Sequence, residues 1–203
     1  MELSLIRTTI KVFKSILLSV INNPAWNVRI QQRLRPLKKH KIILAELLRE
    51  IPRARVLDYG CGEGIFADCF APDKYLGYDP EPKRIDYAKK QFPEYSFTAQ
   101  KPNLNDFDLL FFNNVWHHLT EAQIKNLLRG LTAGKIALLE LKPPSEQRGV
   151  FFKLILWLEA KTHYSRPRKA SFYNELLKRH GFTLQQNRDL ERFFLQLYCL
   201  RKV

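Results

Sequence analysis

The stretch VLDYGCGEGIF, residues 56–66, begins as an apolar strand and then has glycine at alternate positions, Gly60, Gly62 and Gly64. Glycine has no Cβ, so such a turn lets the main chain approach a ligand closely. Dinucleotide-binding turns have the spacing G-x-G-x-x-G and hold a pyrophosphate at a helix N-terminus. Here the spacing is G-x-G-x-G, and Asp58 precedes it. A carboxylate beside the turn would repel a pyrophosphate but suits a cationic ligand, which points away from NAD.

Around this turn, short apolar runs alternate with helical patterns, which is typical of a parallel α/β sheet. The run FDLLFFNN is apolar almost throughout and predicts a strand buried on both faces. We predict seven strands, at residues 54–59, 74–79, 95–99, 107–114, 134–141, 182–188 and 192–200. The expected fold is therefore a doubly wound sheet.

Helices are predicted between and before these strands. Thr120 is the expected N-cap of one helix, and Ser171 and Gly181 are expected to begin and end another. The predicted helices cover residues 3–21, 37–51, a stretch starting near Gly64, and residues 82–92, 121–131, 149–164 and 172–180.

The length of 203 residues and the hydrophobic share of 45% suit one soluble globular domain. No apolar run reaches the roughly 18 residues that a spanning helix needs. The apolar N-terminus is interrupted by Arg7, Lys11 and Lys14 and has no cleavage site, so no secretory signal is expected. The three cysteines form no Cys-x-x-Cys motif, which favours reduced thiols in a cytoplasmic protein, and no metal site is predicted.

The net charge of +14 is concentrated at the two ends of the chain. Residues 1–55 contain 12 Lys and Arg against 3 Asp and Glu, and residues 161–203 contain 10 against 3. Residues 56–160 are nearly neutral, with 12 against 14. Basic ends of this kind can contact nucleic acid, an anionic membrane surface or an acidic substrate, or simply form a solvated surface.

Three segments together, VLDYGCGEG (56–64), YLGYDPEP (75–82) and FDLLFFNNVWHHL (107–119), carry a family resemblance. The chain resembles the class I S-adenosylmethionine-dependent methyltransferases, most closely over residues 54–142. The resemblance implies a Rossmann-like sheet of seven strands in the order 3-2-1-4-5-7-6, with strand seven antiparallel. It also divides the chain into N-terminal helices (1–52), acting as a cap or a membrane-surface element, and a core (53–203) with a substrate lid near residues 145–172.

The resemblance also implies a binding site for S-adenosylmethionine. Asp79, at the end of the second strand, would accept hydrogen bonds from both ribose hydroxyls, and Asp58 would orient the loop and the ammonium group. Relatives often have an aspartate after strand three that contacts the adenine; here Ala99 and Gln100 stand in its place. The predicted cofactor-binding residues are Asp58, Gly60, Cys61, Gly62, Gly64, Asp79, Pro80, Gln100 and Asn113.

His117 and His118 lie where family members place residues that face the transferred methyl. A neutral imidazole at either position could remove a proton from an oxygen or carbon acceptor, and the alternative is a role in packing or helix capping. The motif Asn/Asp-Pro-Pro-Tyr/Phe of amino-group methyltransferases is replaced here by NNVW, residues 113–116. This counts against such nitrogen acceptors but not against RNA or oxygen acceptors. A small-molecule acceptor is expected, and a hydrophobic or lipid-linked one is preferred because the apolar stretch 150–158 lies where relatives build the substrate lid.

The basic ends leave three alternatives open. Residues 3–21 form a basic amphipathic pattern that could lie on the inner membrane surface, or could pack on the domain. Alternatively, six basic side chains could form a phosphate track for RNA, although no RNA-binding module is recognisable. A non-catalytic S-adenosylmethionine-binding or scaffold protein is the third reading. The six residues of the track are Lys38, Lys39, Lys41, Arg166, Arg168 and Lys169.

Overall fold

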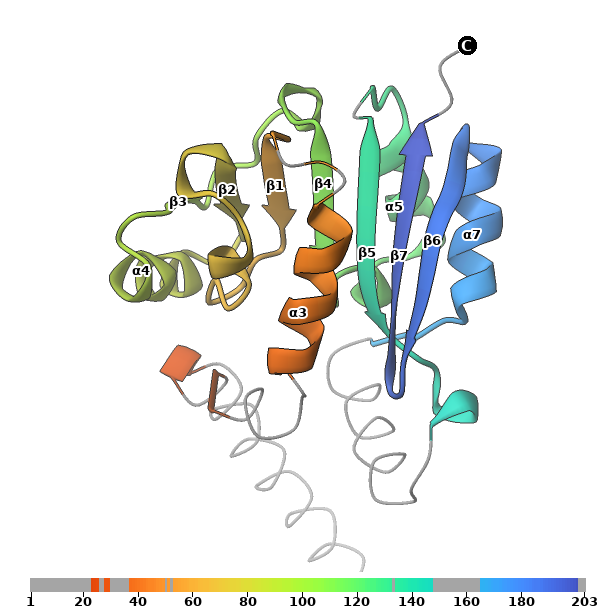
Figure 1. Cartoon of the computed structure of the whole chain (residues 1–203), viewed down its shortest axis with the longest axis horizontal. Coiled ribbons are helices and arrows are strands. Elements are labelled where there is room, and N and C mark those ends of the chain that lie inside the picture. Colours follow the sequence, from red (N-terminus) through yellow and green to blue (C-terminus); the bar gives the residue numbers. More distant parts are fainter. Residues whose placement is uncertain are drawn as a thin grey trace, which may run out of the picture.

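The computed structural model describes residues 23–25, 28–29, 37–49, 51, 53–132, 134–147 and 165–200. Within these residues, seven strands form one sheet in the order β3-β2-β1-β4-β5-β7-β6 (Figure 1). The strands are β1 (Val56–Tyr59), β2 (Tyr75–Tyr78), β3 (Ser96–Thr98), β4 (Leu109–Asn113), β5 (Lys135–Leu141), β6 (Phe182–Leu190) and β7 (Phe193–Leu200).

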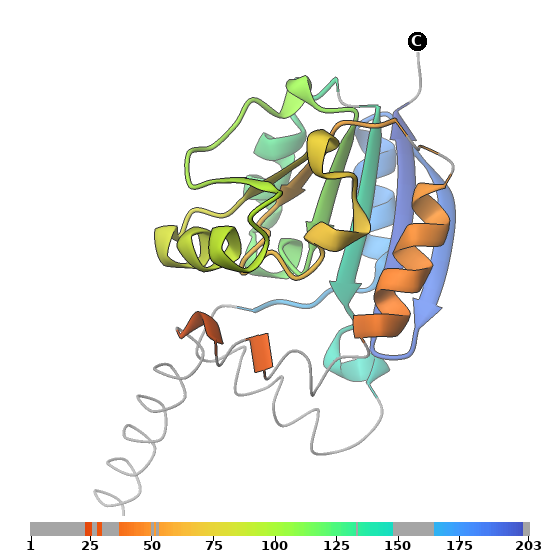
Figure 2. The same ribbon diagram turned by 60° about the vertical axis from the view of Figure 1, so that its left-hand side comes forward.

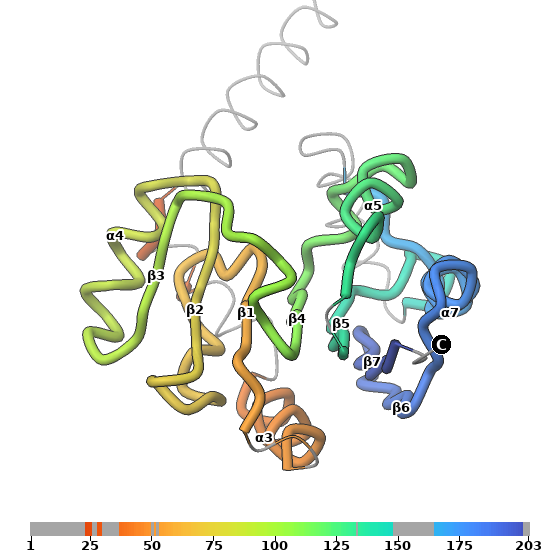
Figure 3. The backbone as a smooth tube through the Cα atoms, turned by 90° about the horizontal axis from the view of Figure 1, so that it is seen from above, coloured from red at the N-terminus to blue at the C-terminus, as the bar shows by residue number. Residues whose placement is uncertain are grey.

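The pairing of the strands confirms the predicted topology. Strands β1 to β5 pair in parallel, whereas β7 pairs antiparallel with both β5 and β6. Figure 3 shows α3 (Leu37–Leu48) on one side of the sheet, with α5 (Glu121–Leu128) and α7 (Ala170–Arg179) on the other. Helix α4 (Pro82–Gln91) packs into the same apolar layer as α3.

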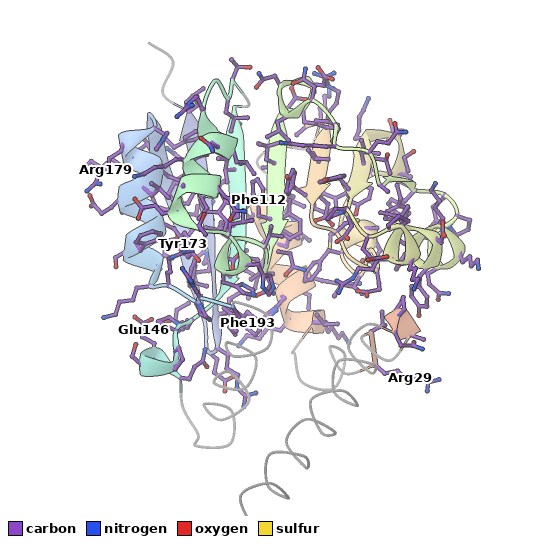
Figure 4. The ribbon with its side chains drawn as sticks, turned by 180° about the vertical axis from the view of Figure 1, so that it is seen from behind. Arg29, Phe112, Glu146, Tyr173, Arg179 and Phe193 are labelled. Carbon is purple, nitrogen blue, oxygen red and sulfur yellow. The ribbon has the colours of Figure 1, made fainter. Side chains whose placement is uncertain are left out.

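The sheet separates two apolar cores. Phe111 belongs to the layer under α3 and α4, and Phe112 belongs to the layer under α5 and α7. Both side chains are fully buried, which confirms the prediction that this strand is covered on both faces. Figure 4 shows Phe112 and Tyr173 on the side of the sheet that α5 and α7 cover.

Several helix ends follow from single residues. Thr120 caps α5 in a complete capping box with Gln123, as predicted for this N-cap. Gly181, at φ +85°, ends α7 as predicted. The predicted cap at Ser171 is wrong, because α7 already begins at Ala170 and its N-cap is Lys169, which makes no side-chain capping bond.

The predicted helix near Gly64 is also wrong. The chain there forms consecutive turns and the short 3₁₀ helix η1 (Ala67–Cys69), held by bonds three residues apart such as Ala67 N to Gly64 O. The φ of +74° at Gly64 is incompatible with a right-handed helix, and Pro72 then limits the length of the segment. The connection from β1 to β2 is therefore a compact loop.

Helix α3 corresponds to the helix predicted at 37–51. The helices predicted at 3–21 and 149–164 lie outside the described residues. In the part of the chain that the structure describes, no helix is long and apolar enough to cross a membrane. The N-terminal end of α3 lies at the same edge of the sheet as the carboxyl ends of the parallel strands, where ligands bind in doubly wound folds (Figure 2).

Candidate active site

The glycine loop after β1 is tied to the end of β2 by its own main chain. The amides of Gly60 and Cys61 both donate to the carbonyl of Tyr78, at 2.7 and 2.9 Å. Gly60 and Gly62 have φ of +78° and +54°, in the left-handed region that side chains disfavour. Glycine at these positions is thus required by the backbone path.

The surroundings of the three glycines differ. A Cβ at Gly60 would lie 2.5 Å from Cγ2 of Val115, and a Cβ at Gly64 would lie 2.9 Å from the Phe97 ring. These two positions are closed by packing. A Cβ at Gly62 would meet only a guanidinium nitrogen of Arg84, at 3.5 Å, so this part of the loop has room on the side where the Cβ would project.

Asp79 links the loop to the start of α4. Its Oδ2 accepts a hydrogen bond from the Gly62 amide and its Oδ1 accepts one from the Glu81 amide, both at 3.0 Å. The residue is 7% exposed. A carboxylate oxygen has two lone pairs, so each oxygen can accept one further hydrogen bond.

Asp58 lies beneath the loop, with an exposed fraction of only 1%. Its Oδ2 accepts a hydrogen bond from the Tyr75 hydroxyl at 2.9 Å, and its Oδ1 has no hydrogen-bond partner among the described residues. Burial raises the pKa of Asp58 to about 7, the negative charge of Asp79 adds to this rise, and the Tyr75 hydrogen bond opposes it. No described amide of the loop donates to Asp58, so its orienting role stays a prediction.

The other four predicted cofactor residues lie at the same edge. The Cys61 side chain is buried in the core, where desolvation raises its thiol pKa, so only its main chain could reach a ligand. Gln100 is exposed, and its main-chain amide donates to Thr98 Oγ1 at 3.0 Å. Asn113 ends β4, and its side-chain oxygen accepts from the Asn114 side chain at 3.0 Å. Pro80, the fourth, directly follows Asp79 and is exposed.

The two histidines follow β4 in the 3₁₀ helix η4 (Trp116–His118) and differ in their surroundings. His117 is buried, and its Nδ1 lies 2.6 Å from Oε2 of Glu140, whereas His118 is exposed. The two imidazole centroids are 4.1 Å apart. A carboxylate acceptor at Nδ1 keeps the proton on that nitrogen and leaves Nε2 as the basic nitrogen of a neutral ring.

Glu140 was missed by the sequence reasoning. It is fully buried near the end of β5, and its Oε1 accepts hydrogen bonds from the Val115 and Trp116 amides at 2.8 and 2.7 Å. The available signal was its position in the otherwise apolar run IALLEL (136–141). A carboxylate in a buried strand requires partners, because an unpaired buried charge is strongly unfavourable.

The loop and the histidine turn are adjacent. The Gly60 position contacts Val115, the residue that precedes η4. The glycine loop, the Asp79 carboxylate at the end of β2 and the Glu140–His117 pair at the ends of β5 and β4 therefore share one edge of the sheet. A cleft of about 390 Å³ lies between α3, the loop and α4, and none of the predicted cofactor-binding or catalytic residues lines it.

The family model described as a methyltransferase domain matches residues 29–187. The chain belongs to this family. The predicted class of a S-adenosylmethionine-dependent methyltransferase is thereby confirmed, although a comparison with curated proteins found no match.

Solved structures with the same fold include several methyltransferases. The magnesium protoporphyrin IX methyltransferase from Synechocystis PCC 6803, with bound S-adenosylhomocysteine, has TM-score 0.65 and 16% identity, over 93% of this chain and 100% of that one. Human N-acetylserotonin methyltransferase, in complex with S-adenosylmethionine, has TM-score 0.66 and 17% identity, over 92% and 59%.

A third structure, from Nostoc punctiforme PCC 73102 and assigned as an O-methyltransferase, has TM-score 0.63 and 20% identity, over 79% of this chain and 56% of that one. This methyltransferase therefore spans little more than half the length of two of the three compared proteins. At these identities the likeness concerns the fold, and it agrees with the strand order of the sheet.

Among the described residues, no group of three His, Cys, Asp or Glu side chains could hold a metal ion.

Proposed function

We propose that this methyltransferase binds S-adenosylmethionine over the glycine loop and transfers its methyl group to a small-molecule acceptor, with His117 as the general base. The observation that carries the proposal is the contact between the Gly60 position and Val115, because it brings the glycine loop next to the His117–Glu140 pair. When bound, S-adenosylmethionine supplies an electrophilic methyl group on a sulfonium.

The residues of the loop fit this cofactor. Asp79 has acceptor capacity on both oxygens, as two neighbouring ribose hydroxyls require. The Gly62 amide donates to Asp79, so the main chain of the loop lies beside the proposed acceptor of the ribose hydroxyls. Asp58, Cys61, Gly64, Pro80, Gln100 and Asn113 remain proposed members of the site; Cys61 would act through its main chain and Gly64 through loop packing.

His117 is the better candidate for the base. The Glu140 carboxylate fixes its tautomer, so Nε2 can remove a proton from the acceptor, an effect worth roughly 10²–10⁴-fold. Alignment of the acceptor with the methyl group can contribute more, up to about 7–11 kcal/mol. His118 is exposed beside the His117 ring, which favours a role in contacting the acceptor.

The acceptor is proposed to be a small molecule, and a hydrophobic or lipid-linked one is preferred. The names of two compared proteins give magnesium protoporphyrin IX and N-acetylserotonin as acceptors, both of which are small organic molecules.

We also propose the division into N-terminal helices at 1–52 and a core at 53–203, with a lid near 145–172. The RNA alternative is less supported, because Lys41 pairs with Asp68 and Arg168 donates to two carbonyls.

The proposal is tested by incubating the protein with methyl-labelled S-adenosylmethionine and fractionated small-molecule, lipid and RNA extracts. We expect label in a small-molecule or lipid fraction and release of S-adenosylhomocysteine. Label in the RNA fraction would support the alternative acceptor instead. Absence of transfer to every fraction, with tight cofactor binding, would support the non-catalytic scaffold.

The role of His117 is tested with the acceptor fraction so found. His117→Gln should lower turnover by roughly 10²–10⁴-fold and leave the calorimetric affinity for S-adenosylhomocysteine unchanged. Glu140→Gln should lower turnover as well. The side-chain amide of the new glutamine can donate to Nδ1, and the proton of the neutral ring would then lie on Nε2. His118→Gln is the matched control, and a larger loss in that variant than in His117→Gln would assign the base to His118.

A further inference from the structure

The segment just before α7 lies against the turn that carries His117. The Arg166 amide donates to the carbonyl of His117 at 2.6 Å. The Arg168 guanidinium donates to the Trp116 carbonyl at 3.1 Å and to the Leu119 carbonyl at 2.8 Å. Figure 2 shows this segment passing along the edge of the sheet toward α7. Residues about fifty positions apart in the sequence thus meet at the candidate site.

The turn is held from two sides. The Glu140 carboxylate binds the amides at its start, from Val115 and Trp116. Arg168 binds carbonyls on both sides of the histidine pair, those of Trp116 and Leu119. His117 and His118 therefore lie between an acceptor that fixes the N–H groups and a donor that fixes the C=O groups.

The turn needs such support, because its own hydrogen bonds are few. It is a single turn of 3₁₀ helix, closed by His118 N to Val115 O at 3.0 Å and Leu119 N to Trp116 O at 3.1 Å. Short 3₁₀ segments have poorer hydrogen-bond geometry than α-helices and are rarely extended. A small rotation of this turn would move the His117 ring relative to the glycine loop.

We infer that Arg168 is a positioning residue that holds His117 in the orientation needed for proton removal. The inference rests on the proposed role of His117 as the base. Arg168 suits the task because its planar guanidinium can donate to two carbonyls at once, whereas a lysine ammonium is a point donor without a fixed fork. The Phe172 ring, with its centroid 5.0 Å from the guanidinium carbon, supports the same orientation.

The side chain is half-buried, so its hydrogen bonds are partly shielded from water. Arg166 provides an internal comparison. Its side chain is exposed, and its main-chain amide donates to the turn. A substitution at position 166 therefore removes a nearby positive charge and leaves the two guanidinium bonds of Arg168 in place.

The test compares Arg168→Gln and Arg168→Lys with the control Arg166→Gln in the full chain. Imidazole nitrogen spectra of ¹⁵N-histidine-labelled protein report the tautomer and titration of His117, assigned with His117→Gln. We expect Arg168→Gln to change these signals, Arg168→Lys to change them less, and the control to leave them as in the wild type. Unchanged His117 signals in both Arg168 variants, or an equal change in the control, would overturn the inference.

Turnover gives the second readout, with the acceptor fraction identified as above. Arg168→Gln should lower kcat by about tenfold to a hundredfold, the size of effect expected from a small misplacement of a catalytic group, with KM for S-adenosylmethionine little changed. An equal loss of cofactor affinity would instead indicate general damage and contradict a positioning role. If the wild-type protein transfers no methyl group, the proposed function fails, while the imidazole spectra still decide whether Arg168 orients His117.

Discussion

Asp58 and Asp79 stand at or just beyond the ends of neighbouring strands, yet their surroundings differ. Asp79 accepts hydrogen bonds from two main-chain amides and retains 7% of its exposure. Asp58 is enclosed by the apolar layer and has Tyr75 as its hydrogen-bond partner. Desolvation disfavours the charged form of a carboxyl group, so the two residues are suited to different roles.

The first prediction concerns the pH dependence of folding. The pKa of Asp58 is raised from 3.8 in the unfolded chain to about 7 in the folded protein, so the folded state binds the extra proton between these values. The stabilisation that this proton gives the folded protein is therefore fully present below pH 3.8 and is lost as the pH rises to about 7. Each unit of the shift corresponds to about 1.4 kcal/mol.

Asp58→Asn should remove this dependence. Urea unfolding at pH 5, 6, 7 and 8 should show the free energy of unfolding of the wild type falling relative to that of the variant, with the difference levelling off above pH 7. Parallel curves for the two proteins would show that Asp58 titrates as in the unfolded chain.

The second prediction concerns Asp79. Asp79→Ala removes the proposed acceptor of the ribose hydroxyls and frees the Gly62 amide, so affinity for S-adenosylhomocysteine should fall by at least about tenfold. Calorimetry measures this, with the exposed Asp73→Ala as control. Equal affinity in both variants would remove Asp79 from the site.

At the scale of elements, the connection between β1 and β2 shows how packing determines a loop. It is closed by turns and short 3₁₀ segments, and its glycines have separate reasons to be there. Gly60 packs against Val115, Gly64 packs against Phe97, and a Cβ at Gly62 would make only an ordinary contact with Arg84. The loop therefore connects the first strand to both the histidine turn and α4.

The third prediction uses two glycines with similar backbone angles. Gly60 and Gly130 have φ of +78° and +70°, but a Cβ at Gly130 would meet nothing within 4 Å. Gly130→Ala should cost about 1–2 kcal/mol of stability from the left-handed conformation alone. Gly60→Ala should cost about 1–3 kcal/mol more, because its Cβ overlaps Val115, and should weaken cofactor binding.

Thermal and urea unfolding measure both variants. Val115→Ala in the Gly60→Ala background should recover the part due to overlap. If the two glycine substitutions have equal effects on stability, the contact with Val115 is not a constraint on the loop.

For the whole molecule, the unequal distribution of charge is the feature that local structure does not explain. Along the sequence, the two basic ends flank a nearly neutral central segment, residues 56–160, which contains the candidate site. We keep the proposal that residues 3–21 contact an anionic membrane surface, which would bring a lipid-like acceptor to the site. Attraction of this kind is screened by salt.

The fourth prediction tests this surface in the full chain. The wild type should sediment with vesicles containing anionic lipid at low salt, and less so at high salt. A variant carrying Arg7→Gln, Lys11→Gln and Lys14→Gln should sediment markedly less. Equal binding of the two proteins, or binding to neutral vesicles only, would contradict an electrostatic contact through this segment.

Much of the architecture could be predicted from local sequence. Apolar runs with turn residues between them predicted all seven strands, and Thr120 and Gly181 predicted two helix ends. The helix expected after Gly64 failed because a positive φ and the close packing of the loop overrode the general strand–helix rhythm. The prediction of Ser171 as a cap was wrong because α7 begins at Ala170, two residues before the start expected from that polar side chain.

The sequence by itself determined the glycine spacing, the alternation of strands and helices, and the residues available for chemistry at the sheet edge. Only the tertiary structure decided that Glu140 contacts His117, that Arg168 donates to two carbonyls of the same turn, and that Asp58 is buried against Tyr75. The physical reason is that backbone conformation depends on neighbours a few residues away. The partner of a buried charge depends on which distant strands and loops pack together, and no local pattern contains that information.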